Sequence, residues 1–451
     1  MKTPQYYVIK DPVHGIMQFT ATEQQWIKPF IDHGYFQRLR HIKQSGLADL
    51  IFPGAVHTRF NHSLGCCYLA SQISNKLGLA DEDRQLVMIA CLLHDIGHGP
   101  FSHAFEFVFH NKAIVHEQWT PLFLNEFNHE AFFKEYNAIN PDFPLNEEKL
   151  DRIKRMIMHE ERENLLLADI VSSQLDADRL DYLLRDSHFC GVQYGEFDLR
   201  WMLHCLTVVD TEHGKRLGVT DKGVGVVEHY LMARRLMRRN IYHHHKKYAI
   251  ENFLVKFLQH LAVEIQRQDF LRDIKHSSLG QLLLNIQAFN ESAKIDAATR
   301  EAFLIENYDL YKRLCDYHVL QVIAELAESS HQHDLVELAK RIHYRRLPEV
   351  FPVSSENVDE INSAVKAFKA RNKKTLRDWQ IEVLKTPHLS YTGSDDPIYV
   401  LEKTGSVKRL HDLSLMIHSL SDQYEHGCSI FIDGALVNEP LIAELFESIA
   451  E

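Results

Sequence analysis

The chain has 451 residues, of which 45% are hydrophobic and 25% are charged, values typical of a globular protein with a large core. This length exceeds that of a usual single domain, so we expect two or three units. The net charge of -12 argues against a protein that coats nucleic acid non-specifically, although a local basic pocket can still bind an anionic ligand.

The seven cysteines include no C-x-x-C pair, which indicates free thiols in a reducing compartment. The first ten residues, MKTPQYYVIK, lack the pattern of a secretory signal. No apolar run approaches the ~18 residues that a membrane span needs. We therefore expect a cytoplasmic protein with no membrane partner.

Helical patterns dominate from about residue 23 to about residue 345, after a short strand at 6–9 and a turn. The expected helices cover 62–77, which Gly78 closes, an apolar 82–93, a long amphipathic 164–187, and 226–266 as one helix or a broken pair.

The composition changes after residue 347. We expect loops at 352–360 and 386–397, and strands at 397–403 and 428–434. The fold class is therefore mainly α, with a helical core over 1–345 and a small C-terminal α+β lobe over 346–451.

The run HDIGHGPFSH places His94 and Asp95 at the end of the apolar helix. With His62 and Asp178 from two other helices, they would form a mononuclear site for one divalent ion, either Mn, Fe, Zn or Mg. Singly, each residue has an ordinary interpretation, such as a helix cap or a solvated side chain. Asp176 and Asp181 are alternatives to Asp178 in the same helix.

Three histidines, His98, His103 and His116, are candidates for general acid or base chemistry because the pKa of histidine lies near neutrality. Glu106 follows His103 by three residues and could orient it across one helical turn.

Two further patterns indicate a phosphate and sugar pocket. Asp178, Tyr182 and Asp186 recur every four residues, and RRLMRRNIYHHHKK concentrates basic side chains in an acidic chain. The alternatives are a solvated polar face for the first pattern, and a solvated, membrane-bound or DNA-bound helix for the second.

The segments DPVHG, QRLRHIKQSG, FPGAVHTRFNHSLG, HDIGHGPFSHAFE, HEQ and LDADRLDYLLRD occur in this order. Through them the chain resembles the HD-domain phosphohydrolases, and within these the deoxynucleoside triphosphate (dNTP) triphosphohydrolases. The resemblance is dense over about residues 5–250, with the HD motifs at about 55–190. It implies an HD-domain helical core.

The resemblance also implies roles for individual residues. The positions of the family's metal ligands are His62, His94, Asp95 and Asp178. The catalytic positions are His103 as proton donor, Glu106 as its supporting carboxylate, and His98 and His116 as phosphate contacts. The substrate-binding positions are Arg59, Arg179 and Arg234 for phosphates, Gln44, Tyr182 and Asp186 for the sugar, and Tyr242 beside its 2′ carbon.

Asp32, Gln37 and Arg40 match the base-reading residues of the family's guanine-nucleotide activator site. Tyr7 and Lys10 replace the phosphate-site residues of the animal enzyme, so the preferred activator, dGTP or GTP, is open. The family also forms oligomers, so we expect a dimer or a tetramer.

We therefore expect metal-dependent hydrolysis of a dNTP to deoxynucleoside and inorganic triphosphate. One alternative is an HD-type nucleotide phosphatase or phosphodiesterase. The other is a non-catalytic HD protein that senses nucleotides or binds single-stranded nucleic acid. The native metal, the preferred base and the biological role are not readable from the residues.

Overall fold

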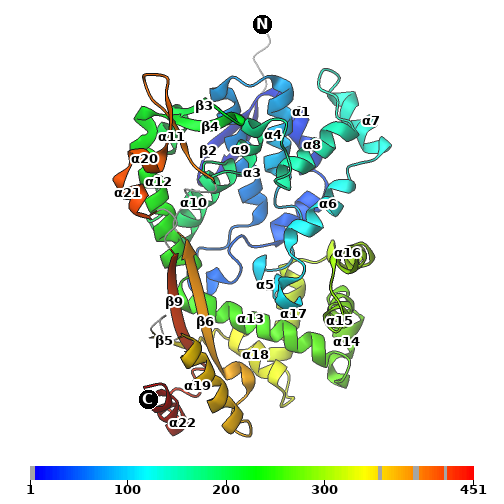
Figure 1. The fold of residues 1–451 in the computed structure, drawn as a ribbon. Helices are drawn as coiled ribbons and strands as arrows, with labels where there is room; N and C mark the ends of the chain where they lie inside the picture. Colours follow the sequence, from blue (N-terminus) through cyan, green and yellow to red (C-terminus); the bar gives the residue numbers. More distant parts are fainter. Residues whose placement is uncertain (1–5, 354–357, 390–395, 421–423, 451) are drawn as a thin grey trace.

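The structure is a computed structural model that describes residues 6–353, 358–389, 396–420 and 424–450. It is mainly helical, with small sheets and a C-terminal α+β lobe at one end, which confirms the predicted fold class (Figure 1). In the described residues, no helix has the length and apolarity needed to cross a bilayer. The predicted loops at 354–357 and 390–395 lie outside the described residues.

The longer helices fall into two groups along the chain. Those of the first half are α1 (Ala21–Ile31), α2 (Gly34–Gln37), α3 (Arg59–Leu77), α4 (Asp81–Leu93), α5 (His103–Glu106), α6 (His116–Asn125), α7 (Glu130–Ile139), α8 (Glu147–Ile157), α9 (Leu165–Val171), α10 (Ala177–Cys190) and α11 (Leu199–Cys205). Those of the second half are α12 (Val224–Met237), α13 (His245–Glu264), α14 (Arg272–His276), α15 (Ser278–Asn290), α16 (Ala297–Tyr311), α17 (Asp316–Ala327), α18 (Asp334–His343), α19 (Val358–Arg371), α20 (Leu410–Leu413), α21 (Leu415–Leu420) and α22 (Pro440–Ala450).

The strands form three separate sheets. A two-stranded hairpin joins β1 (Tyr7–Asp11) and β2 (Gly15–Phe19). A four-stranded sheet has the order β3 (Leu206–Thr211), β4 (Gly214–Thr220), β7 (Tyr399–Leu401) and β8 (Val407–Arg409). A three-stranded antiparallel sheet has the order β5 (Glu349–Val353), β9 (Tyr424–Ile432) and β6 (Ile381–Leu389).

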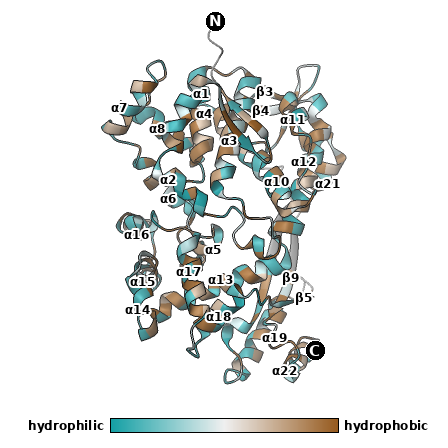
Figure 2. Cartoon of the chain, turned by 180° about the vertical axis from the view of Figure 1, so that it is seen from behind, coloured by the Kyte–Doolittle hydropathy of each residue, from teal (hydrophilic) through white to brown (hydrophobic). Residues whose placement is uncertain are grey.

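Three neighbouring helices, α3, α4 and α10, carry the candidate metal ligands. Local sequence sets their ends: Gly78 follows α3 and Gly191 follows α10, both in the left-handed conformation that glycine adopts without a steric cost. Helix α4 begins with three acidic residues and is buried throughout from Gln85 to Leu93. Its apolar residues appear brown in Figure 2, and other helices surround it.

The prediction of one long helix over 164–187 is wrong. The chain instead forms α9 and α10, with a break between Val171 and Ala177. Asp176 causes the break, because its side chain accepts hydrogen bonds from the backbone N–H groups of Ser173 (2.8 Å) and Arg179 (2.6 Å) and so caps a new helix.

Two other predictions need a different account. The region 226–266 is a broken pair, α12 and α13, joined through a π-helical stretch at Arg238–Tyr242. The hairpin of β3 and β4 lies inside the part of the chain expected to be helical. Gly214, with a φ of 115°, stands at its turn, where a residue with a side chain would be strained.

The loops expected near the C-terminus are shorter than predicted. Strand β5 extends to Val353, and α19 begins at Val358, so only a short connection separates them. Strand β6 continues to Leu389, into the second expected loop. The strands expected at 397–403 and 428–434 are present as β7 and β9.

The C-terminal segment contributes to two cores. Side chains of α19, α22 and the β5-β9-β6 sheet form a small separate core, in which Phe368, Ile430 and Leu445 are buried. Between β6 and β9 the chain leaves this lobe, and Val400 and Leu410 pack into the main helical core (Figure 1). The division of the chain at residue 346 stays a proposal, and the structure adds this excursion to it.

A buried ion pair joins α18 to the end of β9. Arg341 donates from Nε and Nη2 to the two carboxylate oxygens of Asp433, at 2.8 and 3.0 Å. Replacing Asp433 with alanine leaves the guanidinium buried without this partner, so we expect a loss of about 3 kcal/mol in the free energy of unfolding. Urea titration measures the loss, and the exposed Asp412→Ala serves as the control, with a change within about 0.5 kcal/mol. A loss below about 1 kcal/mol for Asp433→Ala would contradict the prediction.

Candidate active site

The four predicted metal ligands come together at one point between α3, α4 and α10. Nε2 of His62 lies 2.9 Å from Asp178 Oδ1 and 3.7 Å from Asp95 Oδ2. Nε2 of His94 lies 3.6 Å from Asp95 Oδ1 and 3.7 Å from Asp178 Oδ1. The order of the chain separates these residues, and the packing of three helices brings their donor atoms within reach of a single cation.

Both imidazoles are held so that Nε2 faces this point. Nδ1 of His62 donates to Asp181 (2.8 Å), and Nδ1 of His94 donates to the carbonyl oxygen of Cys91 (2.8 Å). Nε2 of His94 is buried and makes no hydrogen bond to a described residue. A lone pair directed inward with no donor, beside two carboxylates, fits a divalent cation.

Electrostatics at the site favour a cation. Burial by itself lowers the pKa of His62, but hydrogen bonds to Asp178 and Asp181 outweigh burial and raise that pKa to about 10. Burial raises the pKa of Asp95, yet the guanidinium of Arg59 and the neighbouring histidines bring it well below its usual range. The carboxylates are thus ionised and, without a metal, draw protons onto the imidazoles instead.

Asp181 supports the site from behind. It accepts Nε2 of His14 (2.6 Å) and Nε of Arg185 (2.8 Å) in addition to His62. Arg185 also donates to Asp11 (2.8 Å), so the β1–β2 hairpin is tied to a metal ligand through buried charges. The sequence offered Asp181 only as an alternative to Asp178. The structure separates the two: Asp178 faces the other ligands, and Asp181 orients His62.

The candidate acid-base residues form a second cluster. Glu106 Oε1 lies 3.2 Å from His103 Nδ1 and 2.6 Å from His116 Nδ1. The rings of His98 and His116 are stacked, with centroids 3.6 Å apart, and His98 Nε2 lies 3.2 Å from Asp95 Oδ1. This last contact links the cluster to the metal site. The side chain of His103 is 63% exposed, which leaves it accessible to a ligand.

The protonation states within this cluster differ. Burial raises the pKa of Glu106, but hydrogen bonds to His103 and His116 outweigh it and lower the pKa below its ordinary value. Burial, and then the charge of Arg59, lower the pKa of His98 well below that of a free imidazole. Glu106 is therefore an ionised partner of two histidines, and His98 is neutral at physiological pH.

A cavity of about 750 Å³ opens beside both clusters. Its lining includes most of the predicted substrate residues, namely Gln44, Arg59, Tyr182, Asp186 and Tyr242. Within it, Tyr242 Oη donates to Asp186 Oδ2 (2.7 Å) and His57 Nε2 lies 2.6 Å from Asp186 Oδ1.

Arg179 and Arg234 are not among the residues that line this cavity. Arg179 lies 3.3 Å from Asp176, and Arg234 donates to Gln174 Oε1 (2.6 Å). Arg238 lines the cavity instead. An α-helix would place 234, 238 and 242 on one face, whereas the π-helical stretch from 238 turns the face that follows.

Two lysines in the lining were not singled out from the sequence. Lys112 lies 3.7 Å from Glu106, and Lys247 pairs with Glu251 at 2.8 Å. The run HHHKK was a signal for Lys247, but nothing local marks Lys112.

The predicted activator residues lie near the N-terminal end of the fold. Gln37 accepts a hydrogen bond from Arg40 Nε (2.7 Å), and the Arg40 guanidinium stacks over Phe60, 3.5 Å from the ring centroid. Asp32 ends α1 and pairs with Lys28. An activator role for these residues stays a prediction.

Asp316 is a further residue that sequence reasoning missed. It stands at the start of α17, and its buried carboxylate accepts the backbone N–H groups of Lys43 (2.8 Å) and Phe101 (2.7 Å). These residues immediately precede Gln44 and the His103 segment. A single aspartate at a helix N-terminus is too common for the sequence to indicate this connection.

Asp316 gives a pH-dependent term in stability. Burial outweighs its two backbone hydrogen bonds and raises its pKa to about 6. The folded state then binds more protons than the unfolded state between about pH 4 and pH 6, so stability falls as the pH rises through this range. The stability of the wild type relative to Asp316→Asn should fall by about 1 kcal/mol from about pH 5 to about pH 7 in urea titrations. A constant or rising difference would contradict the assignment.

Comparisons with known proteins agree with this geometry. Residues 59–186 match the HD domain family. An uncharacterized protein of Mycoplasma pneumoniae, the MG461 homolog, is 31% identical over 356 residues, which cover 73% of this chain and 81% of that protein. The chain belongs to the HD-domain phosphohydrolase family. HD domains bind a divalent metal, and His62, Asp95 and Asp178 lie inside the matched range of this HD protein.

Other relatives extend the comparison. Uncharacterized protein YwfO of Bacillus subtilis is 34% identical over 270 residues, and the match covers 58% of each chain. The human deoxynucleoside triphosphate triphosphohydrolase SAMHD1 is 32% identical over 269 residues, which are 52% of this chain and 42% of that enzyme. This HD protein thus spans little more than half of the Bacillus relative and less than half of the human one.

Solved structures share the whole fold. A phosphohydrolase from Bacteroides thetaiotaomicron superposes with a TM-score of 0.74 at 25% identity, covering 95% of this chain and all of that one. A hypothetical protein from Aquifex aeolicus gives a TM-score of 0.71 at 28% identity and covers 98% of this chain.

Proposed function

We propose that this protein hydrolyses a dNTP to a deoxynucleoside and inorganic triphosphate with the help of one divalent cation. The observation that carries the proposal is the junction of the two clusters: the ligand group of His62, His94, Asp95 and Asp178 meets the histidine cluster through the 3.2 Å contact between His98 and Asp95. The similarity to SAMHD1 supports the choice of substrate.

The cation held by these four side chains would supply Lewis-acid polarisation of a phosphoryl oxygen and activation of a water molecule. His103 donates a proton to the 5′-oxygen that leaves the α-phosphorus, and the ionised Glu106 holds and charges its ring. His98, neutral and buried, donates a hydrogen bond toward the anion, and Arg59 adds positive charge beside Asp95.

The basic side chains of the cavity favour a polyphosphate over a monophosphate. Arg59, Lys112, Arg238 and Lys247 all line it. Four cationic groups in one cavity of an acidic protein suit a ligand with several negative charges. Arg179 and Arg234 lie behind this lining, and their proposed phosphate contact would require their present partners, Asp176 and Gln174, to be given up.

The sugar would occupy the part of the cavity formed by Tyr182, Asp186 and Tyr242. Asp186 already accepts hydrogen bonds from His57 and Tyr242, which fix its carboxylate as an acceptor for a 3′-hydroxyl. The Tyr242 ring would then stand beside the 2′ carbon and disfavour a ribonucleotide.

A product assay tests the proposal. The purified chain is incubated with each of the four dNTPs and four NTPs, with Mn²⁺, Mg²⁺, Fe²⁺ or Zn²⁺, in the presence and absence of dGTP. Release of intact triphosphate from a dNTP supports the proposal. Release of orthophosphate or pyrophosphate, or cleavage only of monophosphates or cyclic nucleotides, would assign another HD-type reaction.

Activation by dGTP or GTP and assembly into a dimer or tetramer are parts of the same proposal. They rest on the positions of Asp32, Gln37 and Arg40 and on the family resemblance. Light scattering with and without the nucleotide measures the mass, and a mass of one chain under turnover conditions would contradict the assembly.

A further inference from the structure

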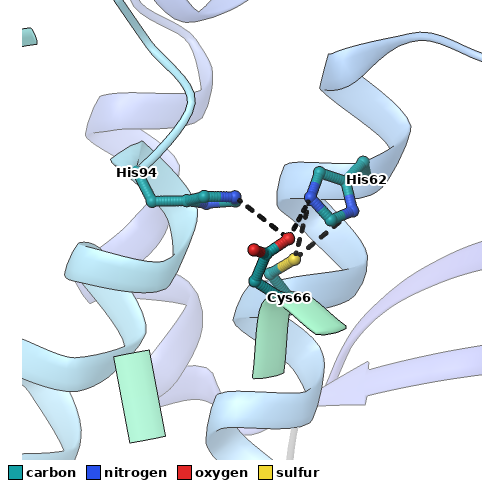
Figure 3. A group of neighbouring side chains, drawn as sticks. His62, Cys66 and His94 are labelled. Carbon is teal, nitrogen blue, oxygen red and sulfur yellow. Dashed lines mark hydrogen bonds and ion pairs between the residues drawn. The ribbon is translucent and has the colours of Figure 1, made fainter. Parts of the chain in front are cut away.

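Cys66 lies against the proposed metal centre on the side opposite to no other predicted ligand. It follows His62 by one helical turn on α3, so the two side chains share a face. Its buried Sγ is 3.5 Å from Nδ1 and 3.6 Å from Nε2 of His62. Figure 3 shows the sulfur of Cys66 directed at the group that includes His62 and His94.

The donor atoms support two overlapping ligand sets. One atom each from His62, Cys66, His94 and Asp178 lie within 4.8 Å of one another. Asp95 completes the other set, and it is also engaged by Arg59 and by His98 at 3.2 Å. His62, His94 and Asp178 are common to both, and the buried Nε2 of His94, which no described side chain satisfies, faces them.

We propose that Cys66 is an alternative metal ligand, which replaces Asp95 when the site binds a thiophilic divalent cation such as Zn²⁺. The sulfur donates an electron pair to the cation, the thiol proton passes to solvent, and no electron is transferred. Two imidazoles, one carboxylate and one thiolate form a tetrahedral set of the kind that closes structural zinc sites. The inference rests on the proposed metal centre.

The two sets have different consequences for chemistry. Hard cations such as Mn²⁺ and Mg²⁺ prefer carboxylate oxygen and leave positions open for water and substrate, whereas a closed set with sulfur leaves none. Zn²⁺ should therefore occupy this protein and inhibit it, while Mn²⁺ supports turnover.

Cobalt spectroscopy reads the sulfur bond directly. The full chain is freed of metal and titrated with Co²⁺ alone. We expect ligand-field bands in the visible, which report occupancy, and a sulfur-to-cobalt charge-transfer band in the near ultraviolet, which reports Cys66. In Cys66→Ser the charge-transfer band disappears while the ligand-field bands remain. Cys67→Ser is the matched control, because Cys67 is the adjacent buried cysteine and lies toward Glu23.

Affinities give a second measurement. Competition with a chromophoric chelator should show that Cys66→Ser weakens Zn²⁺ binding at least about tenfold and changes Mn²⁺ binding less than about twofold. Cys66→Ala should behave in the same way, and the wild-type spectrum is informative even if a variant does not fold.

The outcomes separate the two proposals. Absence of every cobalt band in the wild type would overturn the metal centre and Cys66 together. Ligand-field bands without charge transfer would leave the metal centre intact and overturn the role of Cys66. A charge-transfer band that survives in Cys66→Ser, or is lost in Cys67→Ser, would overturn it as well.

Discussion

Replacing Asp178 with alanine is expected to remove both metal and activity while leaving the fold in place. Its carboxylate contacts both imidazoles of the proposed centre, His62 at 2.9 Å and His94 at 3.7 Å. Loss of the cation removes several kcal/mol of transition-state stabilisation, so kcat should fall about 1,000-fold or more. The side chain of Asp178 is 36% exposed, so its removal creates no buried cavity.

The measurements for Asp178→Ala are metal content per chain, turnover and circular dichroism. Glu82→Ala, an exposed acidic residue in the first turn of α4, is the control and should keep metal and activity. If Asp178→Ala binds metal as tightly as the wild type and turns over at the same rate, the ligand assignment is wrong. A protein that loses activity but keeps its metal would place Asp178 among the substrate contacts instead.

The second large effect concerns His103, the proposed proton donor. His103→Ala should lower kcat by about 100- to 10,000-fold, because the 5′-oxygen must then leave without a proton. Metal content should not change, since the ring lies outside the ligand group and is largely exposed. Glu106→Gln should have a smaller effect, because His103 keeps its place but loses the carboxylate that favours its protonated form.

A substrate analogue separates proton donation from binding. In a dNTP with sulfur in place of the bridging 5′-oxygen, the leaving thiolate needs no proton. His103→Ala should then hydrolyse this analogue within about tenfold of the wild-type rate. His110→Ala, an exposed histidine of the same segment, is the control and should match the wild type on both substrates. Equal losses on the oxygen and sulfur substrates would show that His103 binds rather than protonates.

Much of the local structure follows from the sequence. The apolar run that ends at Leu93 predicts a buried helix, and glycines at 78 and 191 mark two helix ends where a left-handed residue is needed. The break at Asp176 was missed because a capping aspartate inside an amphipathic pattern has the same composition as a solvated helix residue. The β3–β4 hairpin was missed because its strands are short and lie between helical stretches.

The pocket depended on features that periodicity does not carry. A π-helical stretch at 238–242 rotates the face of the helix, so Arg238 rather than Arg234 lines the cavity. Lys112 and Asp316 act through segments far away in the chain, and single residues of these types give no local signal.

The sequence by itself determined the residue types at the centre: two imidazoles and two carboxylates at helix positions, close to a dense histidine motif. Only the tertiary structure decided which aspartate joins them, since Asp178 and Asp181 differ by three residues on one helix and only packing against α3 and α4 directs one to the ligand group and the other to the back of His62. It also brought Cys66 to the same point. Helical spacing predicts which side chains share a face, but which face meets another helix depends on contacts between segments distant in the chain.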